Sequence, residues 1–312
     1  MKMTTVLKKH GVNIAPGTVV QGVWRKNKYD VIRRIGEGIV GSVYLVQHRG
    51  KLFALKISKQ SHSITMETNV LESLQKVQGH FLGPFLLDVD DWRSPNGKVF
   101  SFYVMEYVQG ESLASFLKNH GSDWLGVFLL QLLDQLQKLH EQGYIFGDLK
   151  IEHVIVELSP PTVRFIDFGG VTKRGRAIKE FTEFYDRAYW RLGTRKAEPS
   201  YDLFALVMIF IHLFHPQQFQ RGKHPKQMLL MKLKETRGLH PFTDVFKKAL
   251  LGRYPTSASM VRDVQKVIYH PKQTSRRQRP NHRKTEAKAF FVEVVILSFL
   301  IAIYSFLAFF AS

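Results

Sequence analysis

The chain has 312 residues and is strongly basic: Lys and Arg total 45 against 26 Asp and Glu, which gives a formal net charge of +19. It contains no cysteine, which excludes disulfides and thiolate metal sites. A hydrophobic content of 45% is ordinary for a globular protein, and the length allows one large domain or two lobes. The excess of positive charge predicts an anionic partner: nucleic acid, an anionic membrane surface or a phosphorylated ligand.

The N-terminal part of the chain is expected to be rich in strands. Residues 1–28 are basic and mixed, and we expect an N-terminal extension there without a signal peptide. Apolar and polar residues then alternate, which is typical of half-buried strands. The expected strands cover residues 29–35, 42–47, 51–57, 85–89 and 99–107, and apolar residues at helical spacing predict a helix over 63–77.

After Gly110 the apolar residues change to a helical period. The expected helices cover 113–118, 125–141, 201–214, 225–235, 241–251 and 259–268, with short strands at 154–156 and 163–166. Residues 173–196 are polar, basic and without a clear period, which indicates a long surface segment. This order predicts an α+β fold with a β-rich N-lobe (29–107) and a helical C-lobe (111–270).

The C-terminus has the character of a membrane anchor. Residues 294–311 carry no charge, and the run from 289 reaches the roughly 20 residues that cross a bilayer. Before it lies a basic linker over 271–288, whose cations predict binding of DNA or anionic lipid. These cations include Arg276, Arg277, Arg279, Arg283 and Lys284. Because basic residues collect on the cytoplasmic side, we expect one transmembrane helix with the large N-terminal part in the cytoplasm; a buried helix is the alternative.

Four short motifs carry possible chemistry, and each is weak alone. Asp148 and Lys150 stand two positions apart before a short apolar strand; the acid could accept the proton of an attacking hydroxyl, and the lysine could neutralise a transferred phosphate. The glycine cluster of Gly36, Gly38 and Gly41 lies between two predicted strands, where backbone N–H groups could bind phosphates. Because it enters a strand and not a helix, it argues against a dinucleotide-binding site.

The other two motifs are a lysine on a strand and an acid after a strand. Lys56 has apolar neighbours, so an inward side chain needs an anion such as a nucleotide phosphate. Asp167 ends a strand and precedes Phe168 and Gly169, where its carboxylate could hold magnesium. The four motifs occur in one order at plausible spacings, and together they make a strong signal.

From 29 to 268 the chain therefore resembles a Hanks-type (eukaryotic-like) protein kinase. The resemblance implies a two-lobed kinase fold, ATP and Mg²⁺ as cofactors, Asp148 as the catalytic base and Asp167 as a metal ligand. It pairs Lys56 with Glu67 and leaves Glu72 as the lesser alternative. The residues implied around ATP are Gly36, Gly38, Gly41, Val43, Ala54, Lys56 and Glu67, with Met105 as gatekeeper and the backbones of Glu106 and Val108 as adenine contacts.

The resemblance also implies an activation segment, in which Thr172, Thr182 and Thr194 are candidate phosphorylation sites. Gly193-Thr194 followed by Ala197-Glu198-Pro199 resembles its end, although the usual Ala-Pro-Glu order is altered. Asp202 resembles the buried acid of the following helix that steadies the catalytic loop.

Two positions depart from the family pattern. Gly147 replaces the arginine that normally pairs with a phosphate on the activation segment, so we expect activation chiefly by DNA or self-association. His153 replaces the asparagine that binds a second magnesium ion. Imidazole suits manganese better than magnesium, so we expect either a kinase that relies on Asp167 or an inactive pseudokinase.

The resemblance extends to a group of membrane-anchored Ser/Thr kinases of endospore-forming bacteria that are linked to sporulation and stimulated by DNA. We therefore expect an ATP-dependent Ser/Thr kinase that acts on DNA-associated proteins. One alternative is a silent scaffold bound to DNA or membrane. The other is a small-molecule phosphotransferase, because Gly147-Asp148 resembles the loop of antibiotic and sugar kinases.

Overall fold

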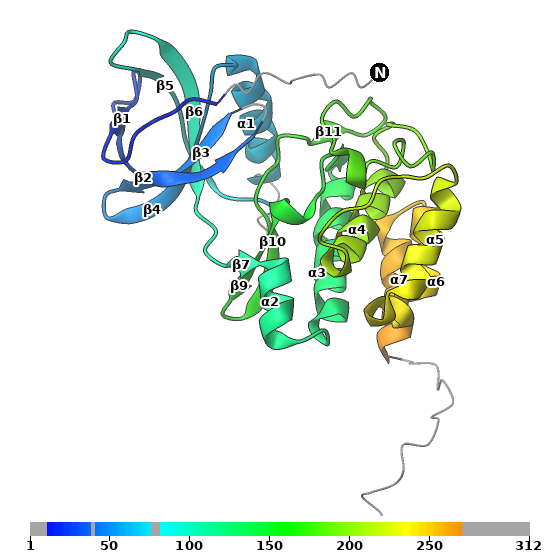
Figure 1. The fold of residues 1–312 in the computed structure, drawn as a ribbon. Coiled ribbons are helices and arrows are strands. Elements are labelled where there is room, and N and C mark those ends of the chain that lie inside the picture. Colours follow the sequence, from blue (N-terminus) through cyan, green and yellow to red (C-terminus); the bar gives the residue numbers. More distant parts are fainter. Residues whose placement is uncertain (1–10, 39–40, 76–81, 270–312) are drawn as a thin grey trace, which may run out of the picture. The chain divides into compact units, whose positions relative to one another are not determined.

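The computed structural model describes residues 11–38, 41–75 and 82–269, all of which belong to one compact unit, Met1–His270 (Figure 1). The predicted linker and membrane anchor, residues 271–311, lie outside the described residues. In the described part, no helix is both long and apolar enough to cross a bilayer.

The N-terminal lobe is a six-stranded antiparallel sheet with one helix (Figure 1). The strands are β1 (Val19–Gln21), β2 (Lys28–Glu37), β3 (Ser42–His48), β4 (Lys51–Ser58), β5 (Leu86–Arg93) and β6 (Val99–Glu106), in the order β1-β2-β3-β4-β6-β5. Helix α1 (Ser61–Gln75) packs against β4, β5 and β6. The alternation of apolar and polar residues thus predicts these strands, and the structure confirms all five that were expected.

Sequence reasoning missed β1, and with it the closure of the sheet. Gly22 forms a bridge with Trp92 of β5, and Val23 N–H donates to Asp91 O at 2.8 Å, so the first strand meets the last. The buried Asp90 carboxylate accepts the backbone N–H groups of Trp24 at 2.9 Å and Arg25 at 2.7 Å. Residues that were expected to form a mixed extension therefore complete the N-lobe barrel.

A segment before β1 also belongs to this lobe. Val12 and Ile14 are buried in the apolar cluster under the sheet. The Tyr44 hydroxyl of β3 accepts from Ile14 N–H at 2.9 Å and donates to Val12 O at 2.6 Å. These contacts lay the segment across the hairpin that carries the glycine cluster.

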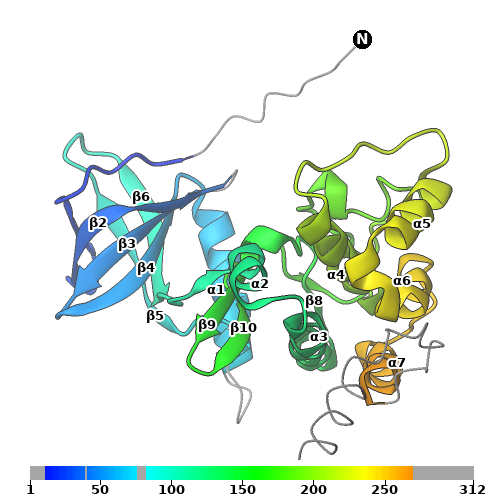
Figure 2. The same ribbon diagram turned by 60° about the horizontal axis from the view of Figure 1, so that its bottom comes forward.

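The C-terminal lobe is helical (Figure 2). Its helices are α2 (Leu113–His120), α3 (Trp124–Glu141), α4 (Pro199–Phe214), α5 (Pro225–Glu235), α6 (Thr243–Leu250) and α7 (Ser257–Tyr269), with one-turn 3₁₀ helices η1 (Ile151–His153) and η2 (Glu183–Tyr185) and the longer η3 (Arg237–Phe242). Helix α4 is buried along most of its length, as its unbroken apolar sequence predicts. It forms the centre of the lobe.

Short strands position the catalytic residues between the helices. Strands β7 (Glu111–Ser112), β9 (Val154–Leu158) and β10 (Pro161–Phe165) form one small sheet, and β8 (Tyr144–Ile145) pairs with β11 (Thr172–Lys173). The two expected strands correspond to β9 and β10. The two-residue strands are too short to produce a periodic signal in the sequence.

Candidate active site

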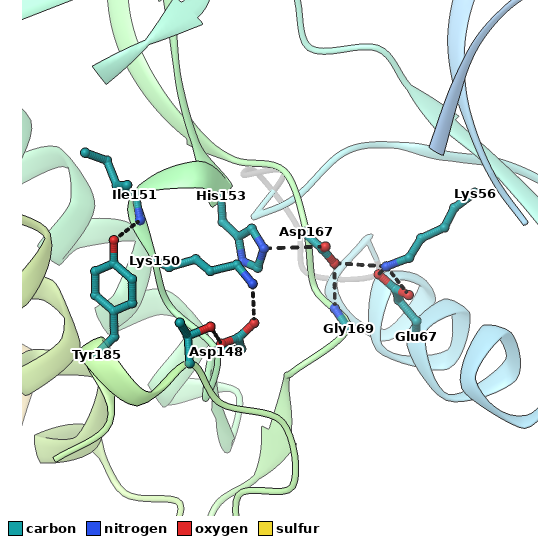
Figure 3. Close-up of polar contacts among 10 residues, drawn as sticks. Lys56, Glu67, Asp148, Lys150, Ile151, His153, Asp167, Gly169 and Tyr185 are labelled. Carbon is teal, nitrogen blue, oxygen red and sulfur yellow. Dashed lines mark hydrogen bonds and ion pairs between the residues drawn. The ribbon is translucent and has the colours of Figure 1, made fainter. Parts of the chain in front are cut away.

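Lys56, Glu67 and Asp167 form an ionic cluster in which Lys56 and Glu67 are buried and Asp167 is half-buried (Figure 3). Lys56 lies on β4 and Glu67 on α1; Lys56 Nζ is 2.8 Å from both Glu67 carboxylate oxygens and 3.0 Å from Asp167 Oδ1. Glu67 is 4% exposed, whereas the alternative Glu72 faces solvent. The structure therefore brings together the predicted lysine, the preferred glutamate and the predicted metal ligand.

The two acids keep this lysine charged. Burial alone would lower the pKa of Lys56, but Asp167 and Glu67 together raise it well above its ordinary value. Burial would likewise raise the pKa of Asp167, but Lys56 and then His153 outweigh burial and hold this pKa well below its usual range. An ammonium and a carboxylate in fixed positions result, and both can act on the phosphates of a nucleotide.

Gly36 lies near the end of β2, and Gly38 and Gly41 lie between β2 and β3. Gly38 N–H donates to Gly41 O at 2.9 Å, and Gly36 lies opposite Val43 in the ladder. A Cβ at Gly41 would stand 2.5 Å from Ile57 O, so this glycine is required by the close approach of β4. The same sheet places Val43 beside Lys56, which aligns the hairpin with the ionic cluster.

The predicted adenine contacts lie on β4, β6 and the chain that follows β6. Ala54 is opposite Met105, and both are buried together with Val108. Glu106 N–H donates to Phe85 O at 2.8 Å, so this N–H is not free for adenine. Its carboxylate forms two hydrogen bonds of 2.8 Å with Arg164 of β10, a link between the lobes that sequence reasoning missed.

The catalytic loop places Asp148 beside Lys150 (Figure 3), and Thr182 of the activation segment contacts the same carboxylate. Lys150 Nζ is 2.7 Å from Asp148 Oδ2, and the Thr182 hydroxyl donates to Asp148 Oδ1 at 2.9 Å. These two contacts fix the orientation of the Asp148 carboxylate, as is required of a base that accepts a proton from a hydroxyl held in one position. Thr182 is one of the candidate phosphorylation sites, and the structure places its hydroxyl against Asp148.

Asp202 of α4 holds the backbone of this loop. Its fully buried carboxylate accepts Phe146 N–H at 2.7 Å and Gly147 N–H at 3.0 Å. It also lies 2.8 Å from Nε2 of the buried His140. The expected steadying role of Asp202 is therefore present, and His140 is a further contact that sequence reasoning missed.

Gly147 has a backbone conformation that excludes most other residues. Its φ is +80°, and a Cβ at this position would stand 2.6 Å from Gly170 O. Gly170 in turn packs against Asp148, where its own Cβ would be 2.8 Å from the Asp148 Cβ. Two glycines thus let the catalytic loop touch the chain after Asp167.

His153 stands beside Asp167, with its Nε2 at 3.6 Å from Asp167 Oδ2. Its Nδ1 is buried and has no hydrogen-bond partner among the described residues. Burial lowers the pKa of His153, which favours the neutral imidazole that can bind a metal. The carboxylate of Asp167 suits Mg²⁺, and the imidazole suits a transition metal such as Mn²⁺ better, so the pair fits a divalent cation.

The activation segment is folded back on itself. Gly175 N–H donates to Ala197 O, Ala197 N–H to Arg176 O and Ile178 N–H to Arg195 O, at 2.7 to 2.8 Å. Thr172 lies in β11 and donates its hydroxyl to Gly170 O, whereas the Thr194 side chain faces solvent. A segment that was expected to lack regular structure is therefore held by its own backbone.

A buried acid organises the end of this segment. Asp186 is 0% exposed and accepts Ala188 N–H, Tyr189 N–H, the Tyr201 hydroxyl and Arg195. Its neighbour Arg187 donates to Thr194 O, Ser200 and Glu198. Sequence reasoning missed both residues, because an Asp-Arg pair in a basic loop gives no sign of burial.

The protein kinase domain model matches residues 29–291 of this chain. The chain belongs to the protein kinase family. The serine/threonine-protein kinase YabT of Bacillus subtilis (strain 168) is 44% identical over 264 residues, which cover 84% of this chain and 78% of the relative. The serine/threonine-protein kinase cek1 of Schizosaccharomyces pombe (strain 972 / ATCC 24843) is 31% identical over 161 residues, 48% of this chain and 12% of that protein.

A human relative matches an equal share of the chain. The cAMP-dependent protein kinase catalytic subunit PRKX of Homo sapiens is 27% identical over 165 residues, 48% of this kinase and 43% of that protein. The chain is thus a protein serine/threonine kinase, and the match favours this activity over the silent scaffold and the small-molecule phosphotransferase.

The family uses ATP and a divalent metal, typically Mg²⁺, which neutralises phosphate charge during transfer. In this chain Asp167, with His153 beside it, would hold the metal. In the chemistry of this family, Lys56 and Lys150 would provide positive charge toward the phosphates, and Asp148 would orient the acceptor hydroxyl and take up its proton.

We predict that His153 sets the metal preference. His153→Asn exchanges a nitrogen donor for an oxygen donor, so the Mg²⁺ concentration for half-maximal activity should fall by about tenfold, while the Mn²⁺ requirement rises. The measurement is peptide phosphorylation against a titration of each metal. His62→Asn, on the exposed face of α1, is the matched control. An unchanged ratio between the two metals would contradict the prediction.

We also predict that Thr182→Glu inactivates the kinase. The new carboxylate would face Asp148 and repel it, and kcat/KM should fall about 100-fold, as for a displaced catalytic group. Thr182→Ser keeps the hydroxyl and should retain most activity. Steady-state kinetics on one peptide decide the matter, and an active Thr182→Glu kinase would show that Thr182 does not position the base.

Proposed function

We propose that this Ser/Thr kinase is anchored to the membrane with its kinase domain in the cytoplasm, and that DNA stimulates it in place of activation-segment phosphorylation. The observation that carries the proposal is Gly147. Its positive φ and its contact with Gly170 leave no room for the arginine that would receive a phosphate.

Internal contacts supply the order that a phosphate would otherwise provide. The backbone pairing of 175–178 with 195–197 and the buried Asp186 hold the segment together. Lys56 already contacts both Glu67 and Asp167. Because the segment is already ordered, its phosphorylation should add little activity. This favours regulation through another part of the chain.

The basic linker is the proposed receiver of that control. Its cations can release counterions from DNA phosphates, the main source of sequence-independent affinity. The formal charge of +19 supports an anionic partner. Anionic lipid attracts the same residues at about 1 kcal/mol each, so lipid is the alternative partner at this linker.

The apolar run 289–311 supports the anchor, and the cations before it support a cytoplasmic kinase domain. DNA-associated proteins and a role in sporulation are proposed as substrates and setting on the resemblance described above. Self-association, which DNA could promote by binding several copies, is a second proposed route of activation.

To test DNA stimulation, five linker cations (Arg276, Arg277, Arg279, Arg283 and Lys284) are replaced by Gln in the full chain. Duplex DNA should raise phosphorylation of a generic protein substrate by the unaltered kinase and not by this variant. If each of the five cations contacts one DNA phosphate, the affinity for DNA should fall with rising salt, and the slope of log affinity against log salt should be no steeper than about −4.5.

A control variant carries the same five-charge loss at exposed lysines of the domain surface. These are Lys51, Lys98, Lys226, Lys234 and Lys247. It should respond to DNA normally. Stimulation by anionic vesicles and not by DNA would make lipid the partner, and no response to either would contradict the proposal.

To test the anchor, residues 289–311 are deleted. The full chain should sediment with membranes in high salt, and the deleted chain should remain in the supernatant. The variant without linker charge keeps the apolar run and should still sediment. A deleted chain that stays with the membranes would show that another segment binds them.

A further inference from the structure

The activation segment presents a compact basic surface, which we call the basic ladder. It consists of residues 173–179 and 195–197, which pair through Ala177 and Lys196 in an antiparallel bridge. Five of its exposed cations form no side-chain hydrogen bond or ion pair with another described residue: Lys173, Arg174, Arg176, Lys179 and Lys196. Side chains alternate along paired strands, so Lys179 shares the outward face with Ala177 and Lys196, while Ile178 and Ala197 are buried.

None of these five cations forms an ion pair with an acid among the described residues, unlike the arginines next to them, although Lys196 is close enough to help Arg187 lower the pKa of Glu198. Arg187 is paired with Glu198 at 2.6 Å and Arg195 with Asp186 at 2.8 Å. The segment thus uses Asp186 and Glu198 to pair its own arginines. Its other two acids are Glu180 and Glu183. Positive charge is left concentrated on one small surface, where an anionic partner would be attracted.

The basic ladder is firmly joined to the catalytic loop. Thr172 and Lys173 pair with Ile145 and Tyr144, immediately before the loop, and Arg174 N–H donates to Gly143 O at 2.8 Å. Ile178 packs with Ile145, Ala197 and Tyr201 in a small apolar cluster. The cations therefore keep a fixed position relative to Asp148.

The basic ladder also lies within reach of a bound substrate. Lys179 precedes Thr182 by three residues, so their Cα atoms are at most about 11 Å apart. The Thr182 hydroxyl contacts Asp148 itself. An extended peptide rises about 3.3 Å per residue, so side chains three to five positions from the acceptor hydroxyl can reach the basic ladder.

We propose that the basic ladder binds an acidic segment of the protein substrate, close to the Ser or Thr that is phosphorylated. The proximity to Asp148 favours a substrate over DNA, because a duplex on this surface would obstruct the approach of the acceptor protein. The proposal rests on the kinase activity and is independent of the anchor and of DNA stimulation.

The test uses the full chain and four synthetic peptides that share one acceptor serine. Two carry four Asp, N-terminal or C-terminal to the serine; one carries neutral residues, and one carries Lys. The unaltered kinase should phosphorylate one of the acidic peptides with a kcat/KM about tenfold above the neutral peptide, mainly through a lower KM. Added salt should reduce this advantage.

The decisive variant reverses both outward lysines, Lys179→Glu with Lys196→Glu. The ratio of its kcat/KM on the acidic peptide to that on the neutral peptide should fall by about tenfold or more, because attraction becomes repulsion. Its activity on the Lys peptide should rise for the same reason. Activity on the neutral peptide reports folding. The control Lys51→Glu with Lys98→Glu makes the same charge change at two exposed residues of the N-lobe, the first residue of β4 and the residue before β6, and should keep the acidic preference.

Three results would overturn the proposal. The unaltered kinase could show no preference for acid, or the preference could persist after reversal at the basic ladder. The third result concerns the Lys179→Glu, Lys196→Glu variant: it could lose binding to duplex DNA, measured by fluorescence anisotropy, and still prefer the acidic peptide. This result would assign the basic ladder to DNA. Activity on the neutral peptide by the unaltered kinase separates any of these from a failure of catalysis.

Discussion

The active site depends on one buried carboxylate, that of Asp202. A fully buried acid is costly unless donors surround it, and here two backbone N–H groups of the catalytic loop and His140 do so. The hydrogen bonds stabilise both partners: the loop provides donors for the buried Asp202 carboxylate of α4, and the carboxylate holds the backbone of Phe146 and Gly147 in place. Asp148 then follows in a fixed position, with its carboxylate oriented by Lys150 and Thr182.

The contact between Gly147 and Gly170 links this constraint to regulation. In a family that often orders its activation segment with a phosphate and an arginine, this chain has backbone pairing and the buried Asp186 instead. The replacement also changes what the basic residues of the segment do. Arg187 and Arg195 are structural, because acids hold them, whereas the lysines of the basic ladder remain available for a partner.

The residues predicted from sequence are those that lie in short motifs on regular elements. Lys56, Glu67 and Asp167 were found because each lies within or ends a periodic segment, and Asp148 because it precedes a short apolar strand. The structure joins the first three in one ionic cluster and places Asp148 on the neighbouring loop (Figure 3). Thr182, Asp186 and Arg164 could not be assigned in the same way. Their roles come from contacts across 34, 15 and 58 residues of chain, and a loop without period carries no signal of such pairing. Strand β1 was missed because three residues are too few to show alternation.

The family match and the folded unit begin at different residues. The match starts at residue 29, but Val12, Ile14 and Val20 are buried under the sheet, where each apolar side chain contributes about 1.5–3 kcal/mol. Tyr44, which binds the backbone of Val12 and Ile14, stands two residues after the start of β3. The position of β3, which follows the glycine cluster, thus depends partly on a stretch that the family match does not cover, and we expect sequence change there to alter nucleotide affinity without touching any residue of the kinase motifs.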